Sequence, residues 1–321
     1  MVAATGKQGG AAGASLHHRA CGEDDYWRIR SFLREVFLLN GRREHSWHVA
    51  RLDYWRWHFV ENLQVCDSLE GATTLWETAG GEIAAVLHAI GRGDARLHVH
   101  ADFRTPALEE EMLAYAEAHL AVRDEAGRRR LYVPTFVDDE LRREVLVRRG
   151  YTRREGQVHH WHGDLPLDAV PAPAGYALRS MGDLDEHPAR SWASWRAFHA
   201  DEPDEAYDGD WSWYANVQRA PLYRRDLDVV AVAPDGGIAA FCTIYYDDVT
   251  RSAVSVLVGT AAEHWRRGLG RAVMTEGLRR AQAMGCTRLF ANAYDPPADA
   301  LYGAVLGTKE ASETWYKALP N

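Results

Sequence analysis

The chain has 321 residues, of which 46% are hydrophobic and 26% charged, and its formal net charge is -9 at pH 7. This composition is typical of a globular protein of about two domains, and the negative charge argues against nucleic acid as the main partner. No apolar run approaches the roughly 18 residues of a membrane-spanning helix, so we expect no membrane association. The four cysteines are scattered without disulfide or metal-binding spacing, which predicts free thiols in a reducing, cytoplasmic setting.

The first half of the chain predicts a mixture of helices and strands. Residues 1–14 are rich in Gly and Ala and lack the apolar core of a signal peptide, so they are interpreted as a disordered tail. Hydrophobic periodicity and turn residues predict helices at 24–39, 52–60, 105–122 and 139–148. Strands are predicted at 15–20, 72–78, 82–90, 95–101 and 130–137, and a strand pair at 151–163.

Three histidines in the last of these segments invite a metal interpretation. Only His160 and His162 would share a face of a strand, because side chains alternate between its two sides. No third ligand is evident, so we interpret them and His159 as exposed or core residues and expect no metal site.

A proline-rich segment at 166–174 lacks periodicity and is predicted to be a linker. After this segment the alternation of helices and strands begins again. Helices are predicted at 184–199, 270–284 and 297–305. Strands are predicted at 175–180, 227–233, 238–247, 252–260, 288–294 and 308–319.

One stretch of the second half is typical of an anion site. A β-branched strand, 254–258, ends in Gly259-Thr260 and is followed by the loop 266–272, RRGLGRA, and a long helix. The first amides of a helix have no partner within the helix, and the helix dipole adds about half a positive charge there. Glycines let a phosphate approach the backbone, and arginines add forked cationic donors. The loop is neither a P-loop, since no Lys-Ser or Lys-Thr follows the glycines, nor a dinucleotide-binding GxGxxG motif.

This loop resembles the pyrophosphate loop of the GNAT superfamily of N-acetyltransferases, whose pattern is Gln/Arg-x-x-Gly-x-Gly/Ala. Trp265 stands at the first position of one alignment, whereas Arg267 to Ala272 fits the pattern in a register shifted by two residues. The resemblance implies acetyl-CoA as the acyl donor and an amine as the acceptor. It implies cofactor contacts at Val258, Gly259, Thr260, Arg266, Arg267, Gly268, Leu269, Gly270, Arg271, Ala272 and Asn292.

The two halves also resemble each other. Ile83 corresponds to Ile238 and Gly150 to Gly307, at offsets of 155 and 157 residues. The layout resembles the mycothiol synthase branch of the superfamily, and implies an α+β fold of two tandem GNAT-like domains, each a mixed, mostly antiparallel central sheet flanked by helices. We expect a degenerate domain at 15–165, because Pro106 supplies no N–H where the other copy has glycines, and an acetyl-CoA-binding domain at 175–321.

The resemblance also implies a proton donor. Tyr302 lies in a segment similar to the family's A-x-x-L-Y turn, and it is predicted to protonate the leaving CoA thiolate. The general base stays open, because the strand before the loop carries no glutamate. Asp247, Asp248 and Glu205 are candidates, each through a chain of water molecules.

The acceptor is inferred from the segment 201–214, where six carboxylates alternate with four aromatic residues. This pattern favours a cationic amine, although a solvated acidic loop would have the same composition. We therefore expect a cytoplasmic N-acetyltransferase acting on a small-molecule amine, as a monomer or homodimer. A non-catalytic acyl-CoA-binding sensor or assembly module is the alternative.

Overall fold

The computed structural model describes residues 15–66, 68–91, 93–168 and 170–320, so the predicted tail at 1–14 lies outside the described residues. The chain divides into two compact units. Unit 1 comprises Met1–Trp47, Val65–Gly156 and Glu313–Asn321, and unit 2 comprises His48–Gln64 and Gln157–Ser312. The expected boundaries differ from these units in three places, because residues 48–64 and 157–165 belong with the second half of the chain and residues 313–321 with the first.

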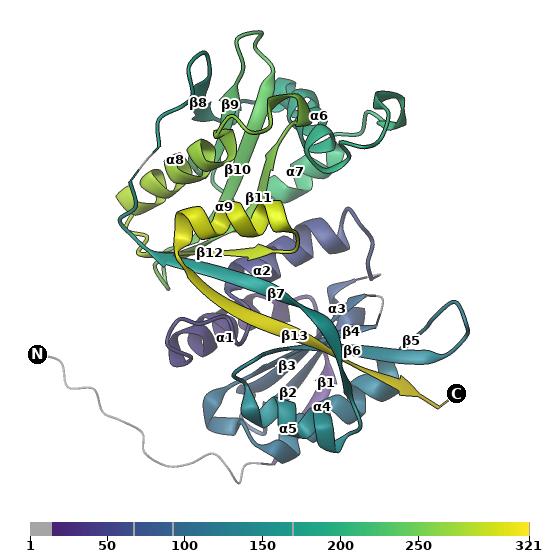
Figure 1. Cartoon of the computed structure of the whole chain (residues 1–321). Helices are drawn as coiled ribbons and strands as arrows, with labels where there is room; N and C mark the ends of the chain where they lie inside the picture. The colour runs from purple at the N-terminus through teal and green to yellow at the C-terminus, as the bar shows by residue number, and fades with distance from the viewer. Residues whose placement is uncertain (1–14, 67, 92, 169, 321) are drawn as a thin grey trace, which may run out of the picture. The chain divides into compact units, whose positions relative to one another are not determined.

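Unit 1 is a sheet covered by helices (Figure 1). Its strands follow the order β1-β2-β3-β4-β6-β13, and β5 pairs with β6. The strands are β1 (Leu16–Ala20), β2 (Thr73–Thr78), β3 (Ile83–Gly91), β4 (Asp94–Val99), β5 (Val122–Arg123), β6 (Arg129–Phe136) and the end of β13 (Thr308–Leu319). The helices are α1 (Asp25–Leu39), α3 (Leu69–Ala72), η2 (Ala101–Phe103), α4 (Pro106–His119) and α5 (Glu140–Arg148). The apolar faces of α4 and α5 pack on the sheet around the buried Trp76.

Unit 2 has the strand order β7-β12-β11-β10-β9-β8. The strands are β7 (Thr152–Asp164), β8 (Ala177–Ser180), β9 (Asp228–Val232), β10 (Ile238–Asp247), β11 (Ser252–Thr260) and β12 (Arg288–Ala293). The longer helices are α2 (Val49–Tyr54), η1 (Trp55–Val60), α6 (His187–Phe198), α7 (Ser212–Gln218), α8 (Leu269–Ala283) and α9 (Pro296–Leu306). Short 3-10 turns are η3 (Leu184–Glu186), η4 (Asp204–Ala206), η5 (Arg225–Leu227) and η6 (Ala262–His264). Helix α8 packs on β9 and β10 (Figure 1), whereas α6 and α2 contact β10 and β11.

Apart from the two-residue strand β5 and short 3-10 turns, the two halves repeat one succession, β-β-β-α-β-α-β, as the sequence predicts. Most described ladders are antiparallel, and parallel pairing occurs between β4 and β6 and between β11 and β12. The expected mixed sheets flanked by helices are therefore confirmed. None of the described helices is both long and apolar enough to cross a membrane.

Two expectations for individual elements were wrong. Segment 151–163 is not a strand pair but the single long strand β7, and the helix expected at 52–60 begins at Val49 and winds as a π-helix from Trp55. Strand β7 also leaves the first half of the sequence: its residues 159–164 pair with β12 of unit 2. In exchange, β13 is the neighbour of β6 in unit 1. Each sheet thus receives a strand from the other half of the sequence.

Candidate active site

The site in unit 2 begins where two parallel strands separate. Strands β11 and β12 share three ladder pairs, which end at Val254 and Phe290. Strand β11 continues to Thr260 while remaining paired with β10 on its other side. Among the described residues, the β12 side of β11 beyond this point therefore has no ladder partner. An open strand edge of this kind can bind an extended chain by backbone hydrogen bonds.

The open edge leads into the glycine loop and the N-terminus of α8. Gly268 is the N-cap residue, with φ 81° in the left-handed region, and no side chain caps the helix. Only glycine adopts that φ at little cost. A Cβ at Gly270 would meet Leu301 and Thr260 at 3.4 and 3.5 Å, which is ordinary van der Waals contact. The first amides of α8 are left to solvent or a ligand, and no acidic residue occupies the first turn.

The arginines and Trp265 take different roles around this loop. Arg267 donates from Nη1 to the Tyr176 hydroxyl at 3.0 Å, which holds it against the surface. Arg266 and Arg271 are exposed. Trp265, which departs from the family pattern, donates from its indole to the Thr260 carbonyl at 2.6 Å. The tryptophan therefore fastens the loop to the end of β11.

The residues predicted to contact the cofactor differ in which groups they can present to it. Val258, Gly259 and Thr260 are half-buried on the open edge, and a Cβ at Gly259 would clash with the Phe241 ring. Leu269 and Ala272 are buried and present only backbone. The Ala272 amide already donates to the Gly268 carbonyl at 3.1 Å, so it is not available to a ligand.

Asn292 lies in a polar cluster that sequence reasoning missed. Its Oδ1 accepts from Arg51 Nη2 at 2.7 Å and lies 3.1 Å from His160 Nδ1. Because an amide oxygen only accepts, His160 carries its proton on Nδ1, and Nε2 accepts from the Ser312 hydroxyl at 2.8 Å. Arg51 comes from α2, a segment assigned to the other domain on sequence, so no local motif could have placed it here.

Tyr302 lies on α9 and is buried, with 8% of its surface exposed. Burial raises the pKa of the Tyr302 phenol, and Cys242 adds to this, while the Arg51 guanidinium acts in the opposite direction. The raised pKa keeps the phenol protonated at neutral pH, as a hydrogen-bond or proton donor must be.

Three carboxylates were proposed as the base, and Asp247 lies away from the α8 loop. Asp247 pairs with Ser252, at the opposite end of β11 from Thr260. It is buried, and its Oδ2 accepts from the Thr250 amide at 3.1 Å and from the Thr250 hydroxyl at 2.8 Å. Glu205 is exposed in η4, and Asp248 is exposed in the turn after β10. The catalytic roles of all three residues stay predictions.

The hydrogen bonds of Asp247 continue into α2. The Thr250 and Ser252 hydroxyls are 2.7 Å apart, and Ser252 lies 2.9 Å from His48 Nε2. His48 Nδ1 accepts from the Ala50 amide, so Nε2 carries the proton and every donor can point toward Asp247. This chain fastens the N-terminus of α2 to the β10–β11 hairpin.

Arg190 is a second residue that the sequence did not single out. It is fully buried on α6, 3.5 Å from the Phe241 ring centroid and 4.8 Å from that of Tyr214. None of its three guanidinium nitrogens has a hydrogen-bond partner among the described residues. The available signal was its spacing from His187 and Ser194 on one helix face, which is buried although polar.

The residues that the structure describes do not support a metal site. Among the residues that the structure describes, no three His, Cys, Asp or Glu side chains could together hold an ion. His159 contacts Asp299 at 2.7 Å, and Cys21 and Cys242 are buried free thiols.

The comparisons agree with this geometry. Residues 189–307 match the family described as Acetyltransferase (GNAT) family. A GCN5-related N-acetyltransferase structure from Sphaerobacter thermophilus is 18% identical, with a TM-score of 0.61 over 94% of this chain and 95% of that one. A tandem GNAT protein from the clavulanic acid biosynthesis pathway is 16% identical, with a TM-score of 0.64 over 96% of this chain and all of that one. No curated protein sequence matches the chain.

At these identities the solved structures show the fold alone, and the tandem GNAT protein has the same two-domain architecture. The family match covers the open edge of β11, the glycine loop, Asn292 and Tyr302. The chain is therefore an acyltransferase that carries a domain of the acetyltransferase (GNAT) family at residues 189–307.

Proposed function

We propose that unit 2 transfers an acetyl group from acetyl-CoA to the amine of a small, cationic molecule. The observation that carries this proposal is the open edge of β11 leading directly into the uncapped N-terminus of α8. The pantetheine amides pair with the backbone of Val258, Gly259 and Thr260 as an added strand would. The pyrophosphate accepts hydrogen bonds from the first amides of α8, between Gly268 and Arg271.

The reaction requires one bond to form and one to break. The neutral amine attacks the thioester carbonyl, the new C–N bond forms, and the C–S bond breaks to release the CoA thiolate. Tyr302 donates its proton or a hydrogen bond to this thiolate, and its buried, neutral phenol supports that role. The proton lost by the amine passes to water, with Glu205 as the exposed candidate acceptor and Asp247 as the buried one.

The acceptor is inferred from charge. The carboxylates of segment 201–210 are exposed. Among the described residues, Asp204 is the one that contacts an arginine or lysine, Arg196 at 3.0 Å, and Glu202 contacts the His199 ring at 2.8 Å. This excess of negative charge favours encounter with a cationic amine. The aromatic rings of Trp192 and Trp195 lie against Tyr207 in the same region.

The test combines binding with turnover. Calorimetry measures acetyl-CoA binding, and a thiol-release assay is run with polyamines, amino acids and neutral amines as acceptors. We expect saturable binding and faster release with polyamines than with amino acids. The absence of acetyl-CoA binding would overturn the proposal. Binding without release for every amine would instead identify a non-catalytic acyl-CoA sensor.

A further inference from the structure

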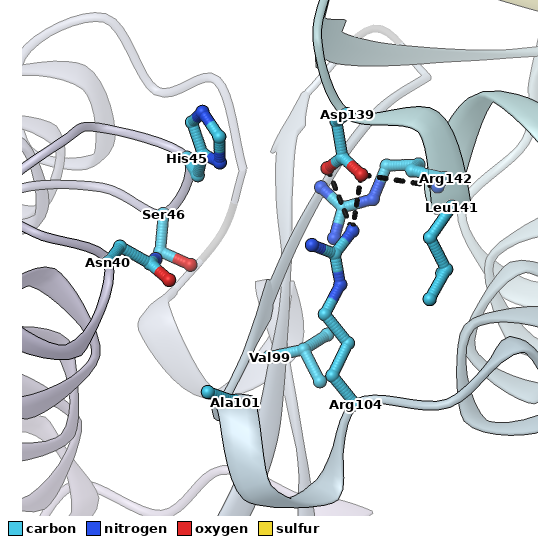
Figure 2. A pocket seen from close by; sticks show the side chains of 9 residues that line it. All are labelled: Asn40, His45, Ser46, Val99, Ala101, Arg104, Asp139, Leu141 and Arg142. Carbon is cyan, nitrogen blue, oxygen red and sulfur yellow. Dashed lines mark hydrogen bonds and ion pairs between the residues drawn. The ribbon is translucent and has the colours of Figure 1, made fainter.

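Unit 1 contains a cavity at the carboxyl end of β4. Strands β4 and β6 share the single ladder pair Asp94–Tyr132. A cavity of about 270 Å³ lies at the far end of β4. Figure 2 shows Asn40 and Ser46 on one side of it and Arg104 on the other. Val99 and Leu141 supply apolar surface.

One wall of the cavity is a charge-balanced network. Arg104 donates from Nε to Glu109 at 2.8 Å and from Nη2 to Asp139 at 2.6 Å. Arg142 donates from Nε to Glu109 at 2.9 Å and from Nη2 at 3.1 Å. Two guanidinium groups therefore meet two carboxylates, and both carboxylates are buried. The wall is rigid and keeps its charges without a ligand.

Three polar groups of the cavity have no such partners. Arg104 Nη1, the Asn40 carboxamide and the Ser46 hydroxyl make no hydrogen bond to any residue that the structure describes. Ser46 is 4% exposed, so water reaches it poorly. The cavity thus offers one cationic donor and two neutral donors beside an apolar surface.

The polar groups of this cavity favour a single carboxylate over a phosphate or a nucleotide. The neighbouring N-terminus of α4 is unavailable to a phosphate, because Thr105 caps it, Pro106 lacks an N–H and Glu109 lies in its first turn. A cavity of about 270 Å³ is also too small for a nucleotide. A single carboxylate matches the one free guanidinium edge and the two neutral donors.

We propose that this cavity binds a small, short-chain carboxylic acid. The carboxylate accepts hydrogen bonds from Arg104 Nη1, Ser46 and Asn40, and the hydrocarbon chain contacts Val99 and Leu141. This site lies wholly within unit 1 and does not depend on the acetyl-transfer proposal for unit 2.

The experiment titrates the full chain with isobutyrate and with isobutyramide, which has the same shape without the charge. We expect isobutyrate to bind at least tenfold more tightly than the amide. Ser46→Ala should weaken isobutyrate binding about tenfold, and Asn40→Asp should weaken it more, because its carboxylate repels the ligand and competes for Arg104. These two positions leave the buried network intact, and thermal unfolding of each variant verifies folding.

A variant of unit 2 separates this site from the acetyl-CoA site. Gly270→Asp should leave isobutyrate binding unchanged, because Gly270 belongs to the other unit. Three results would each overturn the proposal: equal binding of acid and amide, including none at all; unchanged binding in folded Asn40→Asp; or loss of binding in Gly270→Asp.

Discussion

The β4–α4 connection of unit 1 and the β11–α8 connection of unit 2 have the same local architecture and opposite chemistry. In unit 1, Thr105 caps the helix, Pro106 occupies its first position and Glu109 lies in its first turn. In unit 2, the cap is Gly268, and the first turn has neither a capping side chain nor an acid. A helix N-terminus is thus available to a ligand only where the chain does not satisfy it itself.

The arginines beside these two helix N-termini differ in the same way. Arg104 of unit 1 turns inward to Glu109 and Asp139. Arg266 and Arg271 of unit 2 are exposed beside the open helix end. Unit 1 therefore neutralises its cation internally, whereas unit 2 presents positive charge to solvent. The β–α connection of unit 1 thus supplies its own anions, whereas that of unit 2 leaves its helix N-terminus open, and five experiments test this difference.

The largest effect is expected at the centre of the closed network. Glu109→Gln leaves the buried guanidinium of Arg142 and the half-buried one of Arg104 short of a carboxylate, and should lower the free energy of unfolding by about 3–5 kcal/mol in urea titrations. Its neighbour Glu110 pairs with Arg148 at the surface, so Glu110→Gln should change stability by less than about 1 kcal/mol. If the two variants lowered the free energy of unfolding equally, the buried network would stabilise unit 1 no more than a surface ion pair does.

The second largest effect is expected on catalysis by unit 2. Tyr302→Phe should lower kcat about 100- to 1000-fold by removing the proposed proton donor, while the acetyl-CoA Kd stays unchanged. Tyr151→Phe is the control, since Tyr151 is also buried but belongs to unit 1. Steady-state kinetics and calorimetry distinguish the two quantities. A matching loss of affinity in Tyr302→Phe would mean that this tyrosine packs against the cofactor rather than serving turnover.

An acid placed at the second position of each helix tests the N-termini directly. Gly270→Asp puts a carboxylate where the pyrophosphate is proposed to lie, and should weaken acetyl-CoA binding about 100-fold, or about 2.7 kcal/mol. Thermal stability should hold, because an acid favours a helix N-terminus. The matched change Ala107→Asp in α4 should leave acetyl-CoA binding as it is. If both variants bound acetyl-CoA normally, the phosphate would have to lie elsewhere.

Acid should weaken unit 1 through a histidine pair. The rings of His88 and His98 lie 5.1 Å apart in its core, and burial lowers the pKa of His88 to about 3 and that of His98 well below its usual value. The unfolded chain binds protons near pH 6.5, but the folded one does not, so stability is complete above that pH and is lost as pH falls toward 3. At pH 5 each histidine should lower the free energy of unfolding by about 2 kcal/mol.

Urea unfolding at pH 7 and pH 5 measures this loss. The His88→Gln and His98→Gln double variant should lose much less stability between the two pH values. The same pH dependence in wild type and double variant would locate the effect elsewhere, with His58 of unit 2 as the next candidate, because burial lowers its pKa to about 4.

The smallest effect concerns the cap itself. The Thr105 side chain accepts from the Leu108 amide at 3.2 Å, so Thr105→Ala should lower the free energy of unfolding by about 1 kcal/mol. Thr105→Ser keeps the hydroxyl and should be nearly neutral. Equal loss in both variants would indicate that the threonine methyl group, rather than the cap hydrogen bond, stabilises α4.

The succession of elements was predictable because it depends on local rules. Periodicity located β10, β11 and α8 to within a residue or two. The structure starts α8 one residue earlier than expected, at Leu269, after the N-cap Gly268. The resemblance to the acetyltransferase superfamily came from this one loop. The catalytic base was not predictable in the same way, because it depends on which side chains a fold brings near one reacting atom.

The order of strands and helices, the open glycine loop of one half and the capped helix of the other depend on neighbouring residues, so they follow from the sequence. The pairing of β7 with β12, the contact of Arg51 with Asn292, and the position of Asn40 and Ser46 across a cavity from Arg104 depend on how distant segments pack, so they required the folded structure. Local patterns cannot predict contacts between residues far apart in the sequence. Alternation along a strand identifies its buried face, but its hydrogen-bonding edge can pair with any strand that the fold brings to it.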